Sequence, residues 1–216
     1  MAQKLTPATI EILWNRLISI VDEADASVSR TAFSSLVREA HDYGCALFDR
    51  NGREICQGSM ITPGQTGSMI FGVKKMCNIL SRESYQPGDV FIANDPWLLA
   101  GHLNDVSVLS PIFYKDKLVA FTSCVLHHTD IGGGLGYNNR EVFEEGLFIP
   151  VVKLYNAGVA NEAVLDMIRW NVRKPEDVIG DIRSQVAANY VCNQKITEMM
   201  EEMGLDTIDD LADEII

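Results

Sequence analysis

The first part of the chain carries apolar residues at the spacing of one face of an α-helix. They recur every three or four positions, at Ile10, Leu13, Trp14, Leu17, Ile20 and Val21. This period is typical of an amphipathic helix that packs one side against a core. Thr6 is suited to cap such a helix, and Pro7 to occupy its first turn. We expect a helix from Pro7 to about Ala26, followed by a second helical segment over residues 28–40.

Further along, the apolar residues form short runs that are separated by turn residues. Segment 44–58 places Asn51-Gly52 between two such runs, which is a strong indication of a β-hairpin. Residues 88–95 indicate a buried strand that ends in polar residues. Residues 105–130 indicate two strands joined by a turn at Lys115–Lys117, and strands joined by so short a turn must be antiparallel.

The remaining apolar patterns again predict helices. They cover residues 66–80, 159–172 and 175–204, the last with Pro175 at its start and Gly204 as its stop. The whole pattern predicts an α+β fold. In it, a mixed, largely antiparallel sheet carries an N-terminal helical hairpin and C-terminal helices. We expect one domain over residues 1–216, without the phosphate loop of a doubly wound parallel sheet.

The composition argues against several classes of protein, among them nucleic-acid-binding and membrane proteins. The net charge of -12, from 18 Lys+Arg and 30 Asp+Glu, argues against binding to a phosphate backbone, so no nucleic-acid partner is expected. The cysteines are odd in number and lack CxxC spacing: Cys45, Cys56, Cys77, Cys124 and Cys192. Free thiols in a reducing compartment fit this pattern. No signal peptide or membrane-length apolar run is visible, so we expect a cytoplasmic protein without membrane contact.

The end of the sequence predicts one more helix. Asp206 or Thr207 can cap it, and acidic residues suit its first turn. The pattern stops at Ile216 in mid-repeat, without a capping residue or a basic last turn. We therefore expect the 216 residues to be the front part of a longer protein.

Three of the four histidines lie between residues 94 and 128. With the strand turn centred on Asp116 and Tyr114 opposite Leu118, Asp105 faces His127 across the hairpin. His102 lies on the loop that leads to Asp105. Two imidazoles and one carboxylate with open positions are typical of a catalytic metal site, so these three residues are candidate metal ligands. Hydrogen-bonded polar residues at strand ends are the alternative interpretation.

Several neighbouring polar residues are candidates for supporting roles. His128 points to the opposite face in this register, and a one-residue slip would exchange it with His127. Asp130 could be a further ligand, could orient an imidazole, or could act as a catalytic carboxylate. Asn94 and Asp95 could contact substrate or an ion ligand, and ending the preceding strand is an equally good role for them.

The loop Gly132–Gly136 and the charged residues after it complete the candidates. This loop lacks the Lys-Ser/Thr ending of a phosphate loop, so Gly132 and Gly133 are expected to lie beside the site rather than to bind a nucleotide. Glu145 is a second candidate catalytic carboxylate, with Glu144 and Lys153 as possible contacts nearby. Arg173 is either an anion clamp or a surface charge.

Long blocks of the sequence resemble the hydantoinase B family, which includes the 5-oxoprolinase region and a subunit of acetone carboxylase. The resemblance rests on "GDVFIANDPWLLAGHLNDVSVLSPIF" and "HHTDIGGG", and it continues through "EVFEEGLFIPVVKLYNAGVANEAVLDMIRWN". Two departures stand out. The loop after the histidine pair reads "GLGYNNREV" where the family usually has a Pro-Gly-Ser-like turn, and family members are much longer.

The resemblance implies a function that spacing alone does not. Family members work with a hydantoinase A-like partner subunit that binds ATP and activates a cyclic amide or ketone carbonyl by phosphorylation. The B-type subunit then hydrolyses or carboxylates at a metal, here Zn²⁺ or Mn²⁺, whose ligands would be His102, Asp105 and His127. We expect a subunit of an ATP-dependent cyclic-amide hydrolase of the N-methylhydantoinase or 5-oxoprolinase type, inactive alone and working in a hetero-oligomer. The alternatives are an acetone carboxylase-type subunit and a truncated assembly module with a vestigial site.

Overall fold

The computed structural model describes residues 6–60, 62–80, 85–134 and 138–216. Its strands are β1 (Tyr43–Asp49), β2 (Glu54–Gln57), β3 (Val90–Ala93), β4 (Asp105–Tyr114), β5 (Lys117–His127), β6 (Val152–Asn156) and β7 (Val159–Ala160). Its helices are α1 (Pro7–Thr31), α2 (Ser35–Ala40), α3 (Pro63–Ile79), α4 (Glu162–Asn171), α5 (Pro175–Met203) and α6 (Asp209–Ile215), with a 3₁₀ turn, η2, at Val142–Glu144.

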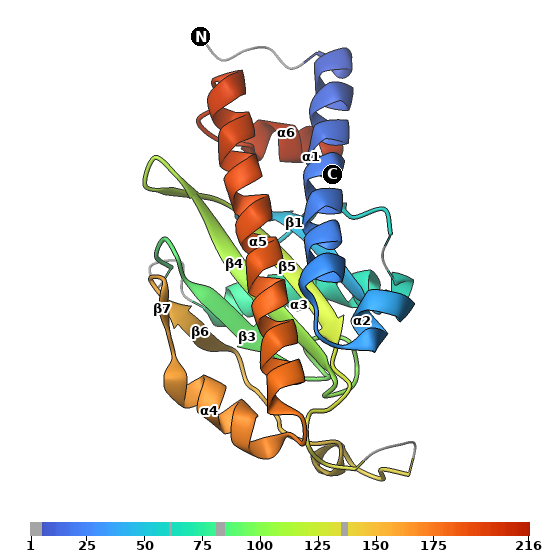
Figure 1. Cartoon of the computed structure of the whole chain (residues 1–216). Helices are drawn as coiled ribbons and strands as arrows, with labels where there is room; N and C mark the ends of the chain where they lie inside the picture. The colour runs from blue at the N-terminus through green and yellow to red at the C-terminus, as the bar shows by residue number, and fades with distance from the viewer. Residues whose placement is uncertain (1–5, 61, 81–84, 135–137) are drawn as a thin grey trace.

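The strands form one sheet with helices on both faces (Figure 1). Their order is β2-β1-β5-β4-β3-β6-β7, and every pairing between them is antiparallel. Alternate residues of β5 show the two faces: Cys124 and Leu126 pack with α1 and α5, whereas Phe121 and Val125 pack with α3. Strands buried on both faces are apolar nearly throughout. The expected α+β fold, with its N-terminal helix, antiparallel sheet and C-terminal helices, is confirmed.

The two N-terminal helices are unequal. The Thr6 hydroxyl caps α1 as expected by accepting from the backbone N–H of Thr9, but the helix runs past Ala26 to Thr31. The second helix is only the six-residue α2, and the expected start of that helix belongs to the last turn of α1. The break between α1 and α2 is stabilised by α5, because the Asp181 carboxylate on that helix accepts the backbone N–H groups of Phe33 and Ser34. A contact between residues so far apart in the chain cannot be predicted from the sequence around the break.

The hairpin of β4 and β5 turns more tightly than expected. Its turn contains two residues, Lys115 and Asp116, which have positive φ values of 48° and 62°. This is the conformation of a type I′ turn, which matches the twist of paired strands. Tyr114 therefore pairs with Lys117 and not with Leu118, so the expected pairing at the turn is wrong.

A register shift lower in the hairpin compensates for the tight turn. Phe113 pairs with Leu118 while Ile112 pairs with Ala120, so Val119 is an extra residue on β5. Beyond this bulge the register is the expected one, as far as the end of the hairpin. Asp105 therefore does lie opposite His127, although the route to that pairing differs.

Other local expectations are largely confirmed, with shifted bounds. β1 and β2 form the hairpin predicted from Asn51-Gly52, and Gly52 has a φ of 74°. Gly204 ends α5 in the left-handed conformation. The segment expected to be helical from residue 159 begins instead as strand β7, which pairs with β6. The expected capping of α6 by Asp206 or Thr207 is wrong, because the N-cap residue is Ile208, which makes no side-chain cap bond. The Thr207 hydroxyl, one residue earlier, accepts the backbone N–H of Asp209.

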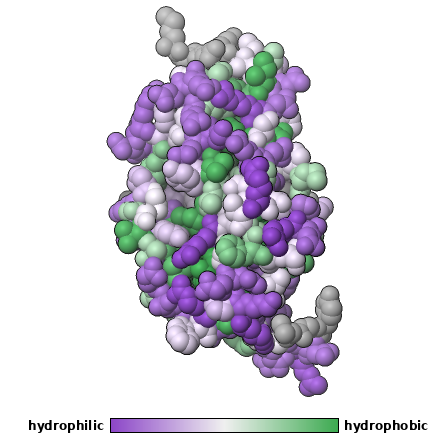
Figure 2. Space-filling view, in the orientation of Figure 1, coloured by the Kyte–Doolittle hydropathy of each residue, from purple (hydrophilic) through white to green (hydrophobic). Residues whose placement is uncertain are grey.

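The surface and the cysteines agree with the composition. On the side that carries α1 and α5, hydrophilic side chains predominate and hydrophobic ones are scattered among them (Figure 2). All five cysteines are free thiols, of which only Cys77 is partly exposed. Among the described residues, no helix is long and apolar enough to cross a membrane.

Candidate metal centre

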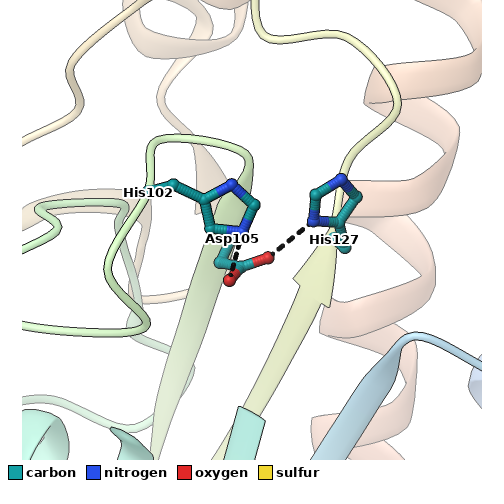
Figure 3. Close-up of side chains that lie close together, drawn as sticks. All are labelled: His102, Asp105 and His127. Atoms are coloured by element: carbon teal, nitrogen blue, oxygen red, sulfur yellow. Dashed lines mark hydrogen bonds and ion pairs between the residues drawn. The ribbon is translucent and has the colours of Figure 1, made fainter. Parts of the chain in front are cut away.

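Two imidazoles and a carboxylate converge at the end of the hairpin of β4 and β5. Asp105 begins β4, His127 ends β5, and His102 lies in the loop before β4. The Oδ2 atom of Asp105 lies 2.6 Å from Nε2 of His102, and its Oδ1 atom lies 2.9 Å from Nδ1 of His127. Figure 3 shows the carboxylate directed toward both rings, whose centroids are 4.8 Å apart.

The electrostatics of this cluster favour an ionised carboxylate. Burial raises the pKa of Asp105, but hydrogen bonds from His102, His127 and Gln65 outweigh it and lower that pKa to about 2. The hydrogen bond to Asp105 raises the pKa of His102 against the opposing effect of burial. A carboxylate that stays charged at neutral pH is a good acceptor for cations and for imidazole N–H groups.

The donor set and its spacing fit a divalent metal ion. Each of the three residues offers one ligand atom, and these atoms all lie within 4.8 Å of one another. Ligands of a tetrahedral Zn²⁺ with bonds of about 2.1 Å lie about 3.4 Å apart, so small side-chain movements would bring all three groups onto one ion. The side chains of His102 and His127 are 38% and 24% exposed, so the cluster is accessible on one side. Further positions around an ion could therefore hold water or substrate.

Two more polar side chains belong to the cluster, and neither was expected from the sequence. Asp42 precedes β1, and its Oδ2 atom lies 4.0 Å from Nδ1 of His127. The Gln65 amide in the first turn of α3 donates to Asp42 and to Asp105. Asp42 could have been found only from the pairing of β1 with β5, in which the His127 N–H donates to the Asp42 carbonyl. Nothing in the local sequence distinguishes Gln65.

Asn94 holds the loop that carries His102. This fully buried side chain donates to the carbonyls of Leu103 and Leu147 and accepts from the N–H of Ile149. It thereby fixes the end of β3 to two loops, which is a positioning role. Asp95 makes a turn instead, because its carboxylate accepts the N–H of Trp97 two residues later. For both residues the observed contacts are the strand-ending ones.

Glu145 reaches the same loop from the other side. Its Oε2 atom accepts the backbone N–H of Leu103 at 2.9 Å, next to His102. The negative charge of Glu145 also contributes to the raised pKa of His102. The structure therefore places this expected carboxylate beside the cluster.

His128 lies on the opposite face of the sheet, as the register predicted. It is fully buried, and its Nε2 atom is 3.3 Å from Oε1 of Gln185 on α5. Burial lowers the pKa of His128. This imidazole is therefore part of the packing between the sheet and α5, on the other side of the sheet from His127.

Asp130 and Arg173 form a separate clamp on the glycine-rich loop. The Asp130 carboxylate accepts the backbone N–H groups of Gly132, Arg173 and Lys174, and it pairs with the Arg173 guanidinium at 2.8 Å. Burial raises the pKa of Asp130, but these bonds outweigh it and keep that pKa low. Arg173 also donates to the carbonyls of Gly132 and Gly133. The guanidinium thus binds the loop backbone.

Gly132 and Gly133 are required by close backbone packing. Both have positive φ, and a Cβ atom at Gly133 would lie 2.4 Å from the backbone of Glu145. A Cβ atom at Gly132 would lie 2.5 Å from the carbonyl oxygen of Asn171. The glycines therefore let this loop pack against the end of α4, at Gly132, and against the segment that carries Glu145, at Gly133. Gly136, the last residue of the loop expected from the sequence, lies outside the described residues.

Comparison with known proteins gives one family match and several similar chains. Residues 6–216 match the family described as Hydantoinase B/oxoprolinase. A protein assigned as the B-type subunit of a D-/L-hydantoinase from Pseudomonas sp. (strain NS671) is 34% identical over 221 residues. That alignment covers 99% of this chain and 37% of the relative, so the chain spans little more than a third of that protein's length.

Two solved structures share the fold. The ATP-dependent caprolactamase from Pseudomonas jessenii superposes with a TM-score of 0.89 at 33% identity, covering 99% of this chain and 37% of that one. A nucleotide-free acetone carboxylase superposes with a TM-score of 0.83, covering 95% of this chain and 27% of that one. Its 21% identity supports a likeness of fold alone.

Proposed function

The chain belongs to the hydantoinase B/oxoprolinase family, and on this premise we propose that it is the metal-binding subunit of an ATP-dependent cyclic-amide hydrolase. The observation that carries the proposal is the convergence of His102, Asp105 and His127 in one accessible cluster. Hydrogen-bonded polar residues would also bring such groups together. The partial exposure of both imidazoles around a buried carboxylate favours a site that receives an ion and a ligand.

The three residues would hold Zn²⁺ or Mn²⁺ through two nitrogens and one oxygen. A divalent ion bound there supplies polarisation of a carbonyl group or acidification of water near neutral pH. Asp105 offsets the charge of the ion, and its low pKa keeps it available as a ligand at neutral pH. Asp42 is a candidate for a further ligand, because its carboxylate lies beside the His127 ring and shares the Gln65 amide with Asp105.

Of the two carboxylates expected to be catalytic, we favour Glu145. It lies beside the loop of His102, where a proton acceptor could reach a ligand bound at the cluster. Asp130 is engaged by three N–H groups and a guanidinium, and its lowered pKa makes it a weak base. We assign Asp130 and Arg173 to the support of the loop that packs against Glu145.

The ATP is expected on a hydantoinase A-like partner subunit. The names of the relatives support this division, since one is named as one subunit of a hydantoinase and another as an ATP-dependent caprolactamase. We therefore propose a hetero-oligomer in which residues 1–216 form one hydantoinase B-like domain. Its substrate would be a ring amide such as a hydantoin, 5-oxoproline or a lactam, activated at the carbonyl.

Metal content tests the proposed ligands. Purified protein should contain about one equivalent of a divalent transition metal, and His102→Ala and Asp105→Ala should each lower its affinity by tenfold or more, because each removes one of three ligands. His41→Asn is the control, since it removes an exposed histidine outside the cluster, and asparagine tolerates the left-handed backbone found there. Equal metal content in the wild type and in both ligand variants, by elemental analysis, would show that the ligand set is wrong.

Substrate stimulation of ATP hydrolysis distinguishes the branches of the family. The chain, co-expressed with a hydantoinase A-like partner, should hydrolyse ATP faster when hydantoin, 5-oxoproline or caprolactam is added. Stimulation only by a ketone with bicarbonate would instead assign it to the carboxylase type. A complex that assembles but responds to none of these would support the assembly module with a vestigial site.

A further inference from the structure

The Gln65 side chain connects the two carboxylates of the metal cluster. Gln65 lies in the first turn of α3, on the sheet face that α3 covers, and is only 5% exposed. Its Nε2 atom donates to Oδ1 of Asp105 at 3.0 Å and to Oδ1 of Asp42 at 3.3 Å. An amide nitrogen carries two hydrogens, so one group can serve two acceptors.

The orientation of this amide is fixed by the carboxylates. Ionised carboxylates only accept hydrogen bonds, so a rotated amide would turn its carbonyl oxygen against both of them. In the observed orientation Oε1 is buried and has no hydrogen-bond partner among the described residues. Leaving a buried acceptor unpaired costs about 1–3 kcal/mol. The two bonds from Nε2 therefore determine how Gln65 lies, at the expense of its own carbonyl.

The bond from Gln65 to Asp105 differs in kind from the bonds made by the histidines. Oδ1 of Asp105 accepts from both Gln65 and His127, whereas Oδ2 faces His102. The imidazoles are themselves candidate ligands, so their bonds to Asp105 compete with binding of an ion. Gln65 is not one of the candidate ligands, and its bond remains compatible with an ion on the imidazoles.

We propose that Gln65 is a positioning residue for a divalent transition metal, acting through Asp105 and Asp42. Its amide holds one oxygen of each carboxylate, which keeps the two groups at a fixed separation and directs their remaining oxygens. Partners that orient metal ligands in this way commonly account for 10- to 100-fold in metal affinity. This inference rests on the proposed function, because it concerns the same cluster of residues.

The test is a double-mutant cycle on metal affinity, with Zn²⁺ and Mn²⁺ as the probes. Gln65→Met keeps a side chain of similar length and removes both donors. We expect this change to weaken binding 10- to 100-fold in chelator competition, with the ion-free protein melting within a few degrees of the wild type. Asn78→Met replaces an exposed amide on the same helix and should leave affinity within twofold.

The second arm of the cycle asks whether Gln65 acts through Asp42. Asp42→Asn should weaken binding, and the double variant should lose less than the product of the two single losses, because the residues share one contact. A purely structural role for Gln65 would lower thermal stability and leave the two losses multiplicative. If Gln65→Met does not fold, Gln65→Asn, one methylene shorter and unable to span both carboxylates, replaces it.

The outcomes separate this inference from the proposed function. If the wild type binds Zn²⁺ or Mn²⁺ and the affinity of Gln65→Met lies within twofold of the wild-type affinity, the positioning role is overturned and the proposed metal site stands. If the wild type binds the ion and the affinity losses of Gln65→Met and Asp42→Asn simply multiply in the double variant, the action through Asp42 is overturned. A wild-type protein that binds neither ion, and behaves like His102→Ala, overturns the proposed metal site and with it this inference.

Discussion

At the scale of the single residue, Asp25 is a buried carboxylate whose surroundings oppose its charge. It is 3% exposed, and burial raises its pKa from the ordinary 3.8 to about 7. Its Oδ1 atom accepts the N–H of Cys45, but Oδ2 is buried without a hydrogen-bond partner among the described residues. Gly58 leaves room for that oxygen, because a Cβ atom there would lie 1.8 Å from it.

Asp25 should make the stability of the protein depend on pH. The folded state holds a proton on Asp25 up to about pH 7, whereas the unfolded chain releases it near pH 4. The free energy of unfolding should therefore fall as the pH rises from about 4 to about 7 and change little on this account above that. Asp25→Asn, which mimics the protonated acid, should remove this slope. At pH 8 it should stabilise the protein by up to about 4 kcal/mol, for a shift of about three pKa units.

Denaturant unfolding at pH 5 and at pH 8 checks this prediction. The control is Asp210→Asn, which removes the same charge from an exposed position on α6. An Asp25→Asn variant that is less stable than the wild type at pH 8 would show that the charged form is favoured in the folded protein.

At the scale of the element, α5 is attached to the sheet by a row of amide side chains. Gln185, Asn189 and Asn193 donate to backbone carbonyls along β4, at residues 106, 108 and 111. From Gln185 to Asn189 the helix rises about 6 Å, close to the roughly 6.6 Å between Val106 and Val108, and Asn193 reaches a carbonyl three residues further along β4. Amides at every fourth helical position can therefore follow the carbonyls of one strand, which sets the direction in which α5 crosses the sheet.

Gln185→Leu should be the most damaging single change in this row. Gln185 is fully buried, donates to the carbonyls of Val106 and Cys124, and contacts His128. Replacing it removes both of these hydrogen bonds and the contact with His128, so we expect the free energy of unfolding to drop by about 1–3 kcal/mol. Gln194→Leu, an exposed position on the same helix, should change it by less than about 0.5 kcal/mol. Equal effects of the two substitutions in urea unfolding would argue against the row as a source of stability.

At the scale of the whole molecule, we expect the isolated chain to be catalytically silent. The family match covers residues 6–216, yet the chain spans 37% or less of each similar protein named above, and its sequence lacks a phosphate-loop pattern. Hydrolysis of hydantoin or 5-oxoproline with ATP should therefore be undetectable for the 216-residue chain and measurable once an ATP-binding partner and the family's full length are supplied. ATP-dependent turnover by this chain alone would reveal a nucleotide site within it.

Local sequence was enough to predict most elements and the central pairing of the candidate site. The turn at Asn51-Gly52, the apolar runs and the helical periods depend on neighbours within a few residues. A short stretch of sequence is therefore enough to predict these elements. The pairing of Asp105 with His127 follows from the two-residue period of antiparallel strands, because both residues belong to one hairpin. A tight turn and a bulge altered the intermediate pairings, and their shifts cancelled before the site was reached.

The groups that surround that pair depend on the packing of distant elements. Asp42 reaches His127 because β1 adds to the edge of β5, and Gln65 reaches Asp105 because α3 covers that face of the sheet. The end of α1 likewise depends on Asp181, which lies about 150 positions away in the sequence on α5. A residue's local pattern describes which way its side chain points from its own element. Which other element it then meets depends on burying apolar faces across the whole chain, and no short stretch of sequence contains that information.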